Sequence, residues 1–150
     1  MNAKLAANIN NMSNDEIYNA IYRDHLTGAL NRRALDEIYK EGQVAIIDLD
    51  SLKYVNDNAG HRYGDALICK LSDLLIYLFG SDNVFRTGGD EFVVIGADHR
   101  ALAEHDTYFS FGLGHDLASA DKDLNANKTH RERMGLRAAR GEQPYWFGEI

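Results

Sequence analysis

The sequence has little of what marks a secreted or membrane protein. Its 150 residues include one cysteine, Cys69, so no disulfide can form within the chain. The longest apolar run is only a few residues, which is too short to span a bilayer. The N-terminal residues 1–5 also lack the apolar core of a secretory signal. These absences predict a cytoplasmic protein with no membrane partner.

Positive charge is also scarce. The chain has 16 Lys and Arg residues against 23 Asp and Glu residues, which gives a net charge of −7 at pH 7. This balance argues against nucleic acid as a partner, because general nucleic-acid binding needs a basic surface. The cations are unevenly placed, since residues 121–150 hold 6 of the 16. A polyphosphate ligand would need local cations, and this C-terminal segment is one source of them.

The rest of the composition is that of an ordinary globular protein, with 45% apolar and 26% charged residues. A chain of this length is most simply one domain with a buried core. We expect a flexible lead over residues 1–12, a single domain over residues 13–140 and an aromatic tail over residues 141–150 that docks on it.

Capping signals and apolar periodicity predict the order of the helices and strands. Ser13 and Glu16 match a capping box at the first helix of the domain, and Asn31 is positioned to cap the next helix. Residues 57–65 are typical of a polar loop, and Ser119 is the expected cap of the last helix. The expected elements are helices over 14–23, 32–40, 51–56, 67–79 and 119–133, a helical turn over 101–105, and strands over 44–50, 83–85, 92–95 and 108–113.

This order predicts an α+β fold of the ferredoxin-like type. After two leading helices the chain runs βαββ, then a short connection, then βα, which should form a βαββ(α)β palm. We expect a mostly antiparallel sheet with the helices packed on one of its faces.

The predicted hairpin carries distinctive chemistry at its tip, where residues 86–92 read RTGGDEF. The two glycines permit a tight turn and let a ligand approach bare backbone. Asp90 and Glu91 then present carboxylates at a sheet edge. Such oxygen ligands suit Mg²⁺, which usually binds through one or two carboxylates plus substrate phosphates. On these residues alone a solvated turn is the alternative.

A second acidic position lies at the end of the strand predicted over residues 44–50. In a ferredoxin-like sheet this strand lies beside the hairpin, so Asp48 and Asp90 can converge. The backbone N–H groups of residues 51–53 then begin a helix and form a ready anion site, to which Lys53 adds a point charge. Phosphoryl transfer needs carboxylates that bind a metal ion and positively charged groups that bind phosphate.

Five segments, in order, resemble the motifs of GGDEF domains, the diguanylate cyclases. Residues 24–33 read DHLTGALNRR, and residues 48–57 read DLDSLKYVND before a GH pair and a GD pair. Residues 86–92 match the signature itself, residues 108–112 read YFSFG, and residues 120–128 read ADKDLNANK. The resemblance covers most of the predicted domain and implies a palm of the nucleotide-cyclase type.

The resemblance implies an activity, the condensation of two GTP molecules into cyclic di-GMP with release of two pyrophosphates. Each domain would hold one GTP. Two domains would face each other, so that each 3′-hydroxyl attacks the α-phosphate of the other nucleotide. GTP is therefore the expected substrate, and a homodimer, at least a transient one, is the expected assembly.

Carried over onto this chain, the resemblance also implies a metal site. Asp48 and Asp90 would bind Mg²⁺ (or Mn²⁺), and the backbone carbonyl of Leu49 would assist. Glu91 would be a further metal ligand or would help to activate the 3′-hydroxyl, and both roles stay open. Asp48, Asp90, Glu91 and Lys53 form the expected catalytic set.

The resemblance assigns a further set of residues to the nucleotide. These substrate-binding residues are Ser51, Leu52, Lys53, Asn56, Asp65, Lys128 and Arg131. The two lysines would hold phosphates, and the asparagine and the aspartate would bind the N–H groups and edge acceptors of guanine. Arg131 or Arg133 would take the place of a phosphate-binding arginine.

The chain departs from the family pattern at four points. The C-terminal helix lacks the family's Tyr and its Gly-Arg-Asn ending. Leu52 replaces the usual Phe. Residues 79–82 lack the arginine of the RxxD inhibitory product site, so product inhibition by that route is not expected. Only residues 96–107 connect the hairpin to the next strand, where the family places a full helix and a loop. This connection is near the lower limit for such a crossover, so one sheet face should be left for the aromatic tail or a second subunit to cover.

Three hypotheses for the function remain open at this point. The chain is an active, stand-alone diguanylate cyclase, a catalytically impaired GTP-binding regulatory module, or a cyclase that makes another cyclic dinucleotide. The sequence shows no sensory domain, so control is expected from expression, dimerisation or a partner.

Overall fold

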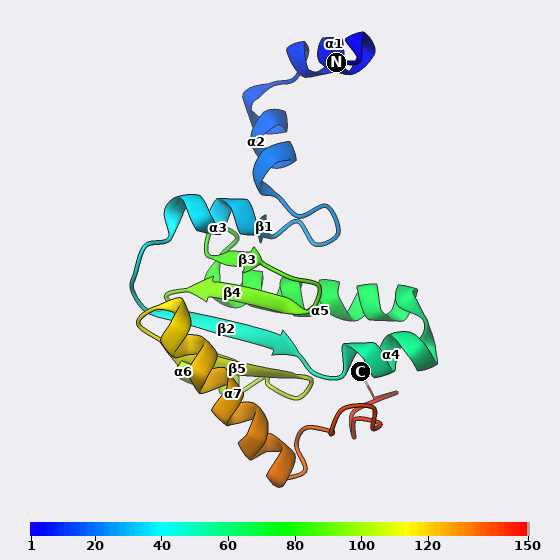
Figure 1. Ribbon diagram of the computed structural model, residues 1–150, viewed down its shortest axis with the longest axis vertical. Coiled ribbons are helices and arrows are strands. Elements are labelled where there is room, and N and C mark those ends of the chain that lie inside the picture. Colours follow the sequence, from blue (N-terminus) through cyan, green and yellow to red (C-terminus); the bar gives the residue numbers. More distant parts are fainter. Residues whose placement is uncertain (150) are drawn as a thin grey trace.

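The computed structural model describes residues 1–149, and Ile150, the last residue of the predicted tail, lies outside the described residues. Its strands are β1 (Leu30–Asn31), β2 (Val44–Leu49), β3 (Val84–Arg86), β4 (Glu91–Ile95) and β5 (Phe109–Gly114). They form one sheet in the order β1-β3-β4-β2-β5 (Figure 1). β1 and β3 are parallel, whereas the other neighbours are antiparallel. The predicted α+β fold with a mostly antiparallel sheet is confirmed.

Seven helices accompany the sheet in the described residues. They are α1 (Ala3–Asn10), α2 (Asn14–Tyr22), α3 (Arg32–Ile38), α4 (Leu52–Ala59), α5 (His61–Phe79), α6 (His99–Ala103) and α7 (Leu117–Arg133). Within residues 1–149 none of them has the length and apolar character needed to cross a lipid bilayer. Figure 1 shows α1 and α2 extending away from the sheet. Residues 3–10 are helical, and the flexibility of residues 1–12 stays a prediction.

The predicted polar loop over residues 57–65 is wrong. Both α4 and α5 run into this stretch, with only Gly60 between them. Gly60 has a φ of 88°, a positive value that glycine adopts readily, and it ends α4. Gly64 lies inside α5, where a Cβ would come within 1.8 Å of the Asn56 side chain. This glycine therefore lets the two helices pack closely and does not mark a loop.

Asp116 caps α7 in place of the predicted Ser119. The Asp116 carboxylate accepts the Ser119 N–H at 2.7 Å, and the Ser119 hydroxyl accepts the Asp116 N–H at 3.3 Å. The two residues form a capping box in which Ser119 is the third residue of the helix. The prediction is wrong by one turn because Asp and Ser both suit the capping position.

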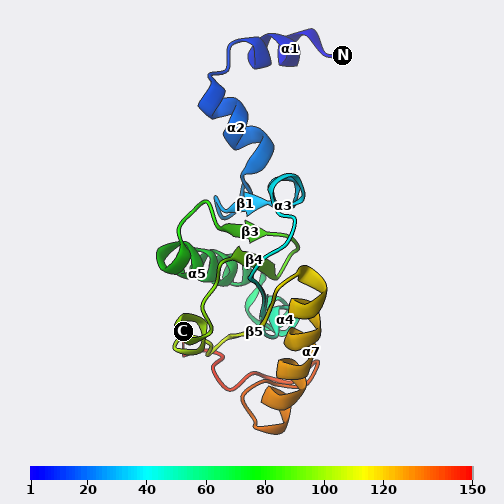
Figure 2. The same cartoon turned by 90° about the vertical axis from the view of Figure 1, so that its left-hand side faces the viewer.

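Helices cover both faces of the sheet, so the prediction of a single covered face is wrong. β2 is paired on both sides, and its alternating side chains enter two separate cores. Ala45, Ile47 and Leu49 pack in the core that includes residues of α4 and α5. Val44 and Ile46 pack in the core that includes residues of α3 and α7. Figure 2 shows α5 and α7 on opposite sides of the sheet.

The aromatic tail docks on the face that holds α4 and α5. Trp146 is 1% exposed and lies edge-on to Tyr108, with ring centroids 6.3 Å apart. Phe147 lies edge-on to Tyr54 at a centroid distance of 5.4 Å. The connection after β4 contains only the five-residue helix α6. The tail therefore covers core that this short connection leaves open.

We expect Trp146→Ala to lower the free energy of unfolding by about 3–5 kcal/mol, because truncating a buried aromatic side chain leaves a cavity. Urea denaturation followed by circular dichroism measures the change. Tyr145→Ala is the control, since Tyr145 is 53% exposed. Its effect should stay below about 1 kcal/mol. Equal losses in the two variants would contradict the docking of the tail.

β5 and α7 approach so closely at Gly112 that no side chain fits between them. A Cβ there would lie 2.1 Å from the backbone nitrogen of Leu124 and 2.3 Å from the carbonyl oxygen of Ala120. We expect Gly112→Ala to lower the free energy of unfolding by more than about 4 kcal/mol or to prevent folding. Thermal denaturation should separate this variant from Gly89→Ala, whose new Cβ would meet no atom within 4 Å. Similar melting temperatures would show that the strand and the helix separate easily.

Candidate functional site

An ion pair fixes the tip of the β3–β4 hairpin. The Arg86 guanidinium donates to both oxygens of Asp24, at 3.2 and 3.1 Å, and to the Gly89 carbonyl at 2.9 Å. Asp24 also accepts the N–H and the hydroxyl of Thr27, at 2.9 and 2.8 Å. The turn that precedes β1 is thereby joined to the hairpin tip. The sequence marks both segments, but not the ion pair that connects them.

The hairpin places Asp90 beside Asp48, as the strand order requires. β2 and β4 are paired, and the Leu49 N–H donates to the Asp90 carbonyl at 2.9 Å. Burial, and next the negative charge of Asp48, raise the pKa of Asp90, and a hydrogen bond between the two carboxyl groups adds to the rise. Lys128 of α7 contacts the Asp48 carboxylate. The pair can hold a cation, because a positive charge beside both groups would stabilise their ionised forms.

Glu91 lies next to this pair in sequence but is held elsewhere. Its carboxylate accepts the Thr87 hydroxyl at 2.5 Å. It lines a separate cavity of about 260 Å³ that is bordered by α3 and α7. Within residues 1–149 no three or more His, Cys, Asp or Glu side chains are grouped so that they could hold a metal ion. Asp48 and Asp90 form a pair of carboxylate donors, and a cation held there would need further ligands from elsewhere, such as backbone, water or substrate.

A larger cavity of about 730 Å³ lies beside the two aspartates. One wall is formed by the ends of the strands and the start of α4, and it includes Asp48, Leu49, Ser51, Leu52, Lys53 and Asp90. The other wall is formed by the end of α7 and the segment after it, and it includes Glu132, Arg137, Ala138, Arg140 and Gly141. The structure thus brings six of the predicted site residues together. The sequence analysis does not predict the residues of the second wall. The concentration of cations after residue 120 is the one feature of the sequence that points to it.

The start of α4 is suited to an anion. Ser51 has a φ of 60° and is the one non-glycine residue with a positive φ among residues 1–149. No side chain of the described residues caps the helix at this position. Its first backbone N–H groups are therefore available to a ligand in the cavity. The exposed Lys53 lies on the same wall.

The two predicted guanine-binding residues lie at the joint between α4 and α5. The side-chain oxygen of Asn56 is buried and has no hydrogen-bond partner among the described residues. Asp65 is exposed and follows Gly64, the residue against which Asn56 packs. Both lie outside the lining of the 730 Å³ cavity. An unpartnered buried amide oxygen is unusual in a folded protein and is consistent with a ligand site.

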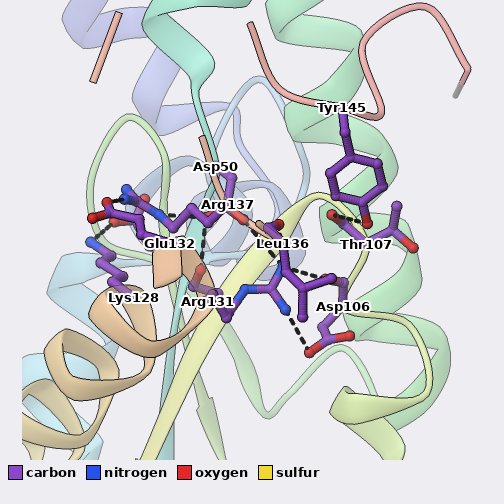
Figure 3. Close-up of polar contacts among 11 residues, drawn as sticks. Asp50, Asp106, Thr107, Lys128, Arg131, Glu132, Leu136, Arg137 and Tyr145 are labelled. Carbon is purple, nitrogen blue, oxygen red and sulfur yellow. Dashed lines mark hydrogen bonds and ion pairs between the residues drawn. The ribbon is translucent and has the colours of Figure 1, made fainter. Parts of the chain in front are cut away.

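Asp50 organises a network on the second wall (Figure 3). It is 1% exposed and accepts hydrogen bonds from the Ser110 hydroxyl at 2.8 Å and from Arg137 Nε at 3.1 Å. Arg131 donates to it at 3.4 Å and to the Asp106 carboxylate at 3.0 Å. Burial raises the pKa of Asp50, whereas Ser110 and the two arginines oppose the rise.

The arginines of the C-terminal region differ in whether they line the 730 Å³ cavity. Arg131, a predicted phosphate ligand, has a buried guanidinium that Asp50 and Asp106 hold, and it lies outside the cavity lining. Arg133 is exposed and is also outside the lining. Arg137 and Arg140, which the motifs do not indicate, line the cavity. A local motif cannot find them, because their position depends on contacts with Asp50 and the tail.

Comparison with known proteins gives one family. The family model described as diguanylate cyclase, GGDEF domain, matches residues 21–108. The chain is 40% identical to diguanylate cyclase DosC of Escherichia coli (strain K12) over 131 residues, which cover 79% of this chain and 25% of that protein. It is 33% identical to diguanylate cyclase DgcS of Shewanella oneidensis over 137 residues, which cover 75% of this chain and 46% of that protein. The chain thus spans less than half the length of these curated relatives.

Solved structures show the same fold. A sensory box/GGDEF family protein from Caulobacter crescentus matches with a TM-score of 0.54 and 26% identity, covering 73% of this chain and 99% of that chain. The coiled coil and GGDEF domain of DgcB from Caulobacter crescentus, in complex with c-di-GMP, matches with a TM-score of 0.58 and 19% identity. That match covers 89% of each chain.

We expect the Asp24–Arg86 pair to stabilise the protein in a pH-dependent way. Burial by itself would raise the pKa of Asp24, but hydrogen bonds from Thr27 and Arg86 outweigh burial and lower the pKa. A carboxyl group whose pKa falls on folding stabilises the protein above its unfolded pKa of about 4, and this stabilisation is lost as the pH falls through the folded pKa. Asp24→Asn should therefore lower the free energy of unfolding by roughly 1–2 kcal/mol at pH 7, allowing for partial exposure, and by less at pH 3.

Denaturant unfolding at pH 7 and pH 3 measures this difference. Asp36→Asn is the matched control, since Asp36 forms only an exposed ion pair with Arg32 within α3. Its effect should be small at both pH values. A loss in Asp24→Asn that is the same at pH 7 and pH 3 would contradict the stabilising role of the ionised carboxylate.

Proposed function

Because the chain belongs to the diguanylate cyclase, GGDEF domain family, we propose that it condenses two GTP molecules into cyclic di-GMP. One observation carries the proposal: the Asp48–Asp90 pair lies on the wall of a 730 Å³ cavity that also presents Lys53, Arg137 and Arg140. Carboxylates for a metal beside cations for phosphate are the groups that nucleotidyl transfer requires.

The cation that this proposal requires is Mg²⁺ or Mn²⁺, which the carboxylates of Asp48 and Asp90 would hold together with the Leu49 carbonyl. The donor chemistry fits, because Mg²⁺ binds through few carboxylates and completes its ligands with phosphates and water. The raised pKa of Asp90 reflects burial beside a second carboxylate, and a divalent cation relieves that repulsion. Such a cation would supply positive charge to the reacting phosphate.

The protein side chains hold the nucleotide around this pair. The start of α4 and Lys53 bind phosphates, and Asn56 and Asp65 bind guanine at the α4–α5 joint. Lys128, which contacts Asp48 in the structure, adds a further charge for phosphate. Glu91 is bound to Thr87 and is not grouped with the aspartates. That separation argues against Glu91 as a ligand of the same cation, so we assign it the other role, activation of the 3′-hydroxyl.

Two copies of the domain are needed for the product. In each half-reaction the 3′-oxygen of one GTP would form a bond to the α-phosphorus of the other as the bond to pyrophosphate breaks. The hydroxyl proton would pass to a base, the role proposed for Glu91. One cavity holds one GTP, so a second copy must supply the other nucleotide. A homodimer that forms at least transiently is therefore part of the proposal.

A GTP-binding regulatory module is the second candidate. Two observations favour it: the contact of Lys128 with Asp48, and the short connection through α6, which trims the scaffold. In this case the chain would bind GTP without turnover. A cyclase that makes another cyclic dinucleotide is the third possibility, and the choice of nucleotide in the assay distinguishes it.

The test is a product assay. Purified protein incubated with GTP and Mg²⁺ should form cyclic di-GMP, which chromatography detects together with pyrophosphate. Asp90→Asn should lower the rate at least about 100-fold, because it removes one of two metal carboxylates. Asp36→Asn should leave the rate unchanged. Binding of GTP without any product would favour the regulatory module, and equal use of ATP would favour a different cyclic dinucleotide.

A further inference from the structure

The cavity beside Asp48 and Asp90 is bordered by a segment that lies outside all five sequence motifs. We call residues 137–141 the C-terminal wall. Arg137, Ala138, Arg140 and Gly141 of this wall line the cavity opposite the start of α4. The wall follows α7 and precedes the docked aromatic tail, so its position depends on contacts at both of its ends.

The first end is fixed by a buried charge. Arg137 donates from Nε to the buried Asp50 carboxylate at 3.1 Å and also contacts Glu132. The preceding residue, Leu136, donates its N–H to the Arg131 carbonyl at 2.8 Å. Because Asp50 lies immediately after β2, these contacts tie the wall to the same strand that presents Asp48.

The second end is fixed by the tail. Trp146 is buried in the core, and Pro144 before it is also buried. Gln143 accepts a hydrogen bond from the Tyr54 hydroxyl at 3.2 Å, which joins the tail to α4 on the opposite wall. The wall is therefore held across the cavity and is not a free terminal extension.

The two arginines of the wall differ in their partners. The charge of Arg137 is shared by Asp50 and Glu132. Arg140 is exposed, lines the cavity, and has no hydrogen bond or ion pair with any other residue of the described chain, 1–149. A guanidinium presents several donors in a planar fork that matches phosphate oxygens. Arg140 is thus positioned for an anion that residues 1–149 do not supply.

We propose that Arg140 binds the polyphosphate of the nucleotide, and that the contacts of Arg137 and Trp146 position the wall that carries it. The assignment rests on the proposed function in one respect, that the cavity takes a nucleoside triphosphate. It differs from the sequence prediction, which gives this role to Arg131. Here Arg131 positions the end of α7 through Asp50 and Asp106.

Calorimetric titration with GTP and with inorganic tripolyphosphate, each with Mg²⁺, tests the proposal on the full chain. Arg140→Ala should weaken the binding of both probes about tenfold, because each loses a charge-assisted hydrogen bond. Binding of guanosine, which has no phosphate, should not change. Arg140→Lys should recover part of the affinity, since it keeps the charge but not the fork. Arg133→Ala is the matched control, because Arg133 is exposed and lies outside the lining.

The outcomes separate this proposal from the proposed function. If Arg140→Ala binds tripolyphosphate as the wild type does, the assignment of Arg140 is overturned, whether or not cyclic di-GMP is made. If wild-type binding of tripolyphosphate depends on Arg140 but no cyclic dinucleotide forms, the assignment holds and the cyclase proposal fails. Equal weakening by Arg133→Ala, or no binding of either probe by the wild type, would also overturn the assignment.

Discussion

The buried carboxylate of Asp50 is the constraint on which the C-terminal third of the structure depends. An unpaired carboxylate so far from water would cost several kcal/mol, so hydrogen-bond and charge partners must be brought to it. Ser110 supplies one from β5, Arg131 supplies another from α7, and Arg137 supplies a third from the chain beyond that helix. One buried charge at the end of β2 thereby fixes three later segments of the chain.

The end of β2 also carries Asp48, the carboxylate that lines the cavity. Asp48 and Asp50 are two residues apart, so alternation along the strand could direct both to one face, but β2 ends at Leu49 and the two carboxylates have different environments. Asp48 remains partly exposed next to Asp90, whereas Asp50 is enclosed by the arginines. The first can serve a ligand, and the second holds the protein scaffold around that ligand. Sequence spacing alone does not separate these two roles.

The sequence predicts the features that short segments determine. The apolar run of β2, the hairpin around Gly88 and Gly89, and the capping box at Ser13 are local patterns, and the structure has all three. The convergence of Asp48 and Asp90 follows once the strand order is known. Covered faces on both sides of the sheet were also within reach of prediction, because a continuous apolar strand is typical of burial on both faces.

The remaining features depend on partners that are distant in the sequence. In the sequence Gly64 is typical of a loop, and only the packing of Asn56 against it explains a glycine inside a helix. Arg131 and Arg137 are both arginines near the end of the chain. Only the contact of Arg131 with Asp106, in the short connection after α6, shows which of them is enclosed. The second wall of the cavity could therefore be anticipated as an excess of cations but not as particular residues.

The charges that line the cavity affect how it could bind a polyanion. Its lining contains four carboxylates, from Asp48, Asp57, Asp90 and Glu132, and three cations, from Lys53, Arg137 and Arg140. Counted with every lining group ionised, the negative charges exceed the positive ones by one, and a divalent cation held by the two aspartates would make the lining net positive. Binding of the proposed cation and binding of a polyphosphate would then favour each other, because each would offset charge that opposes the other. Under the proposed function the acidic pair and the C-terminal wall would act together, the pair through the cation and the wall through the phosphates.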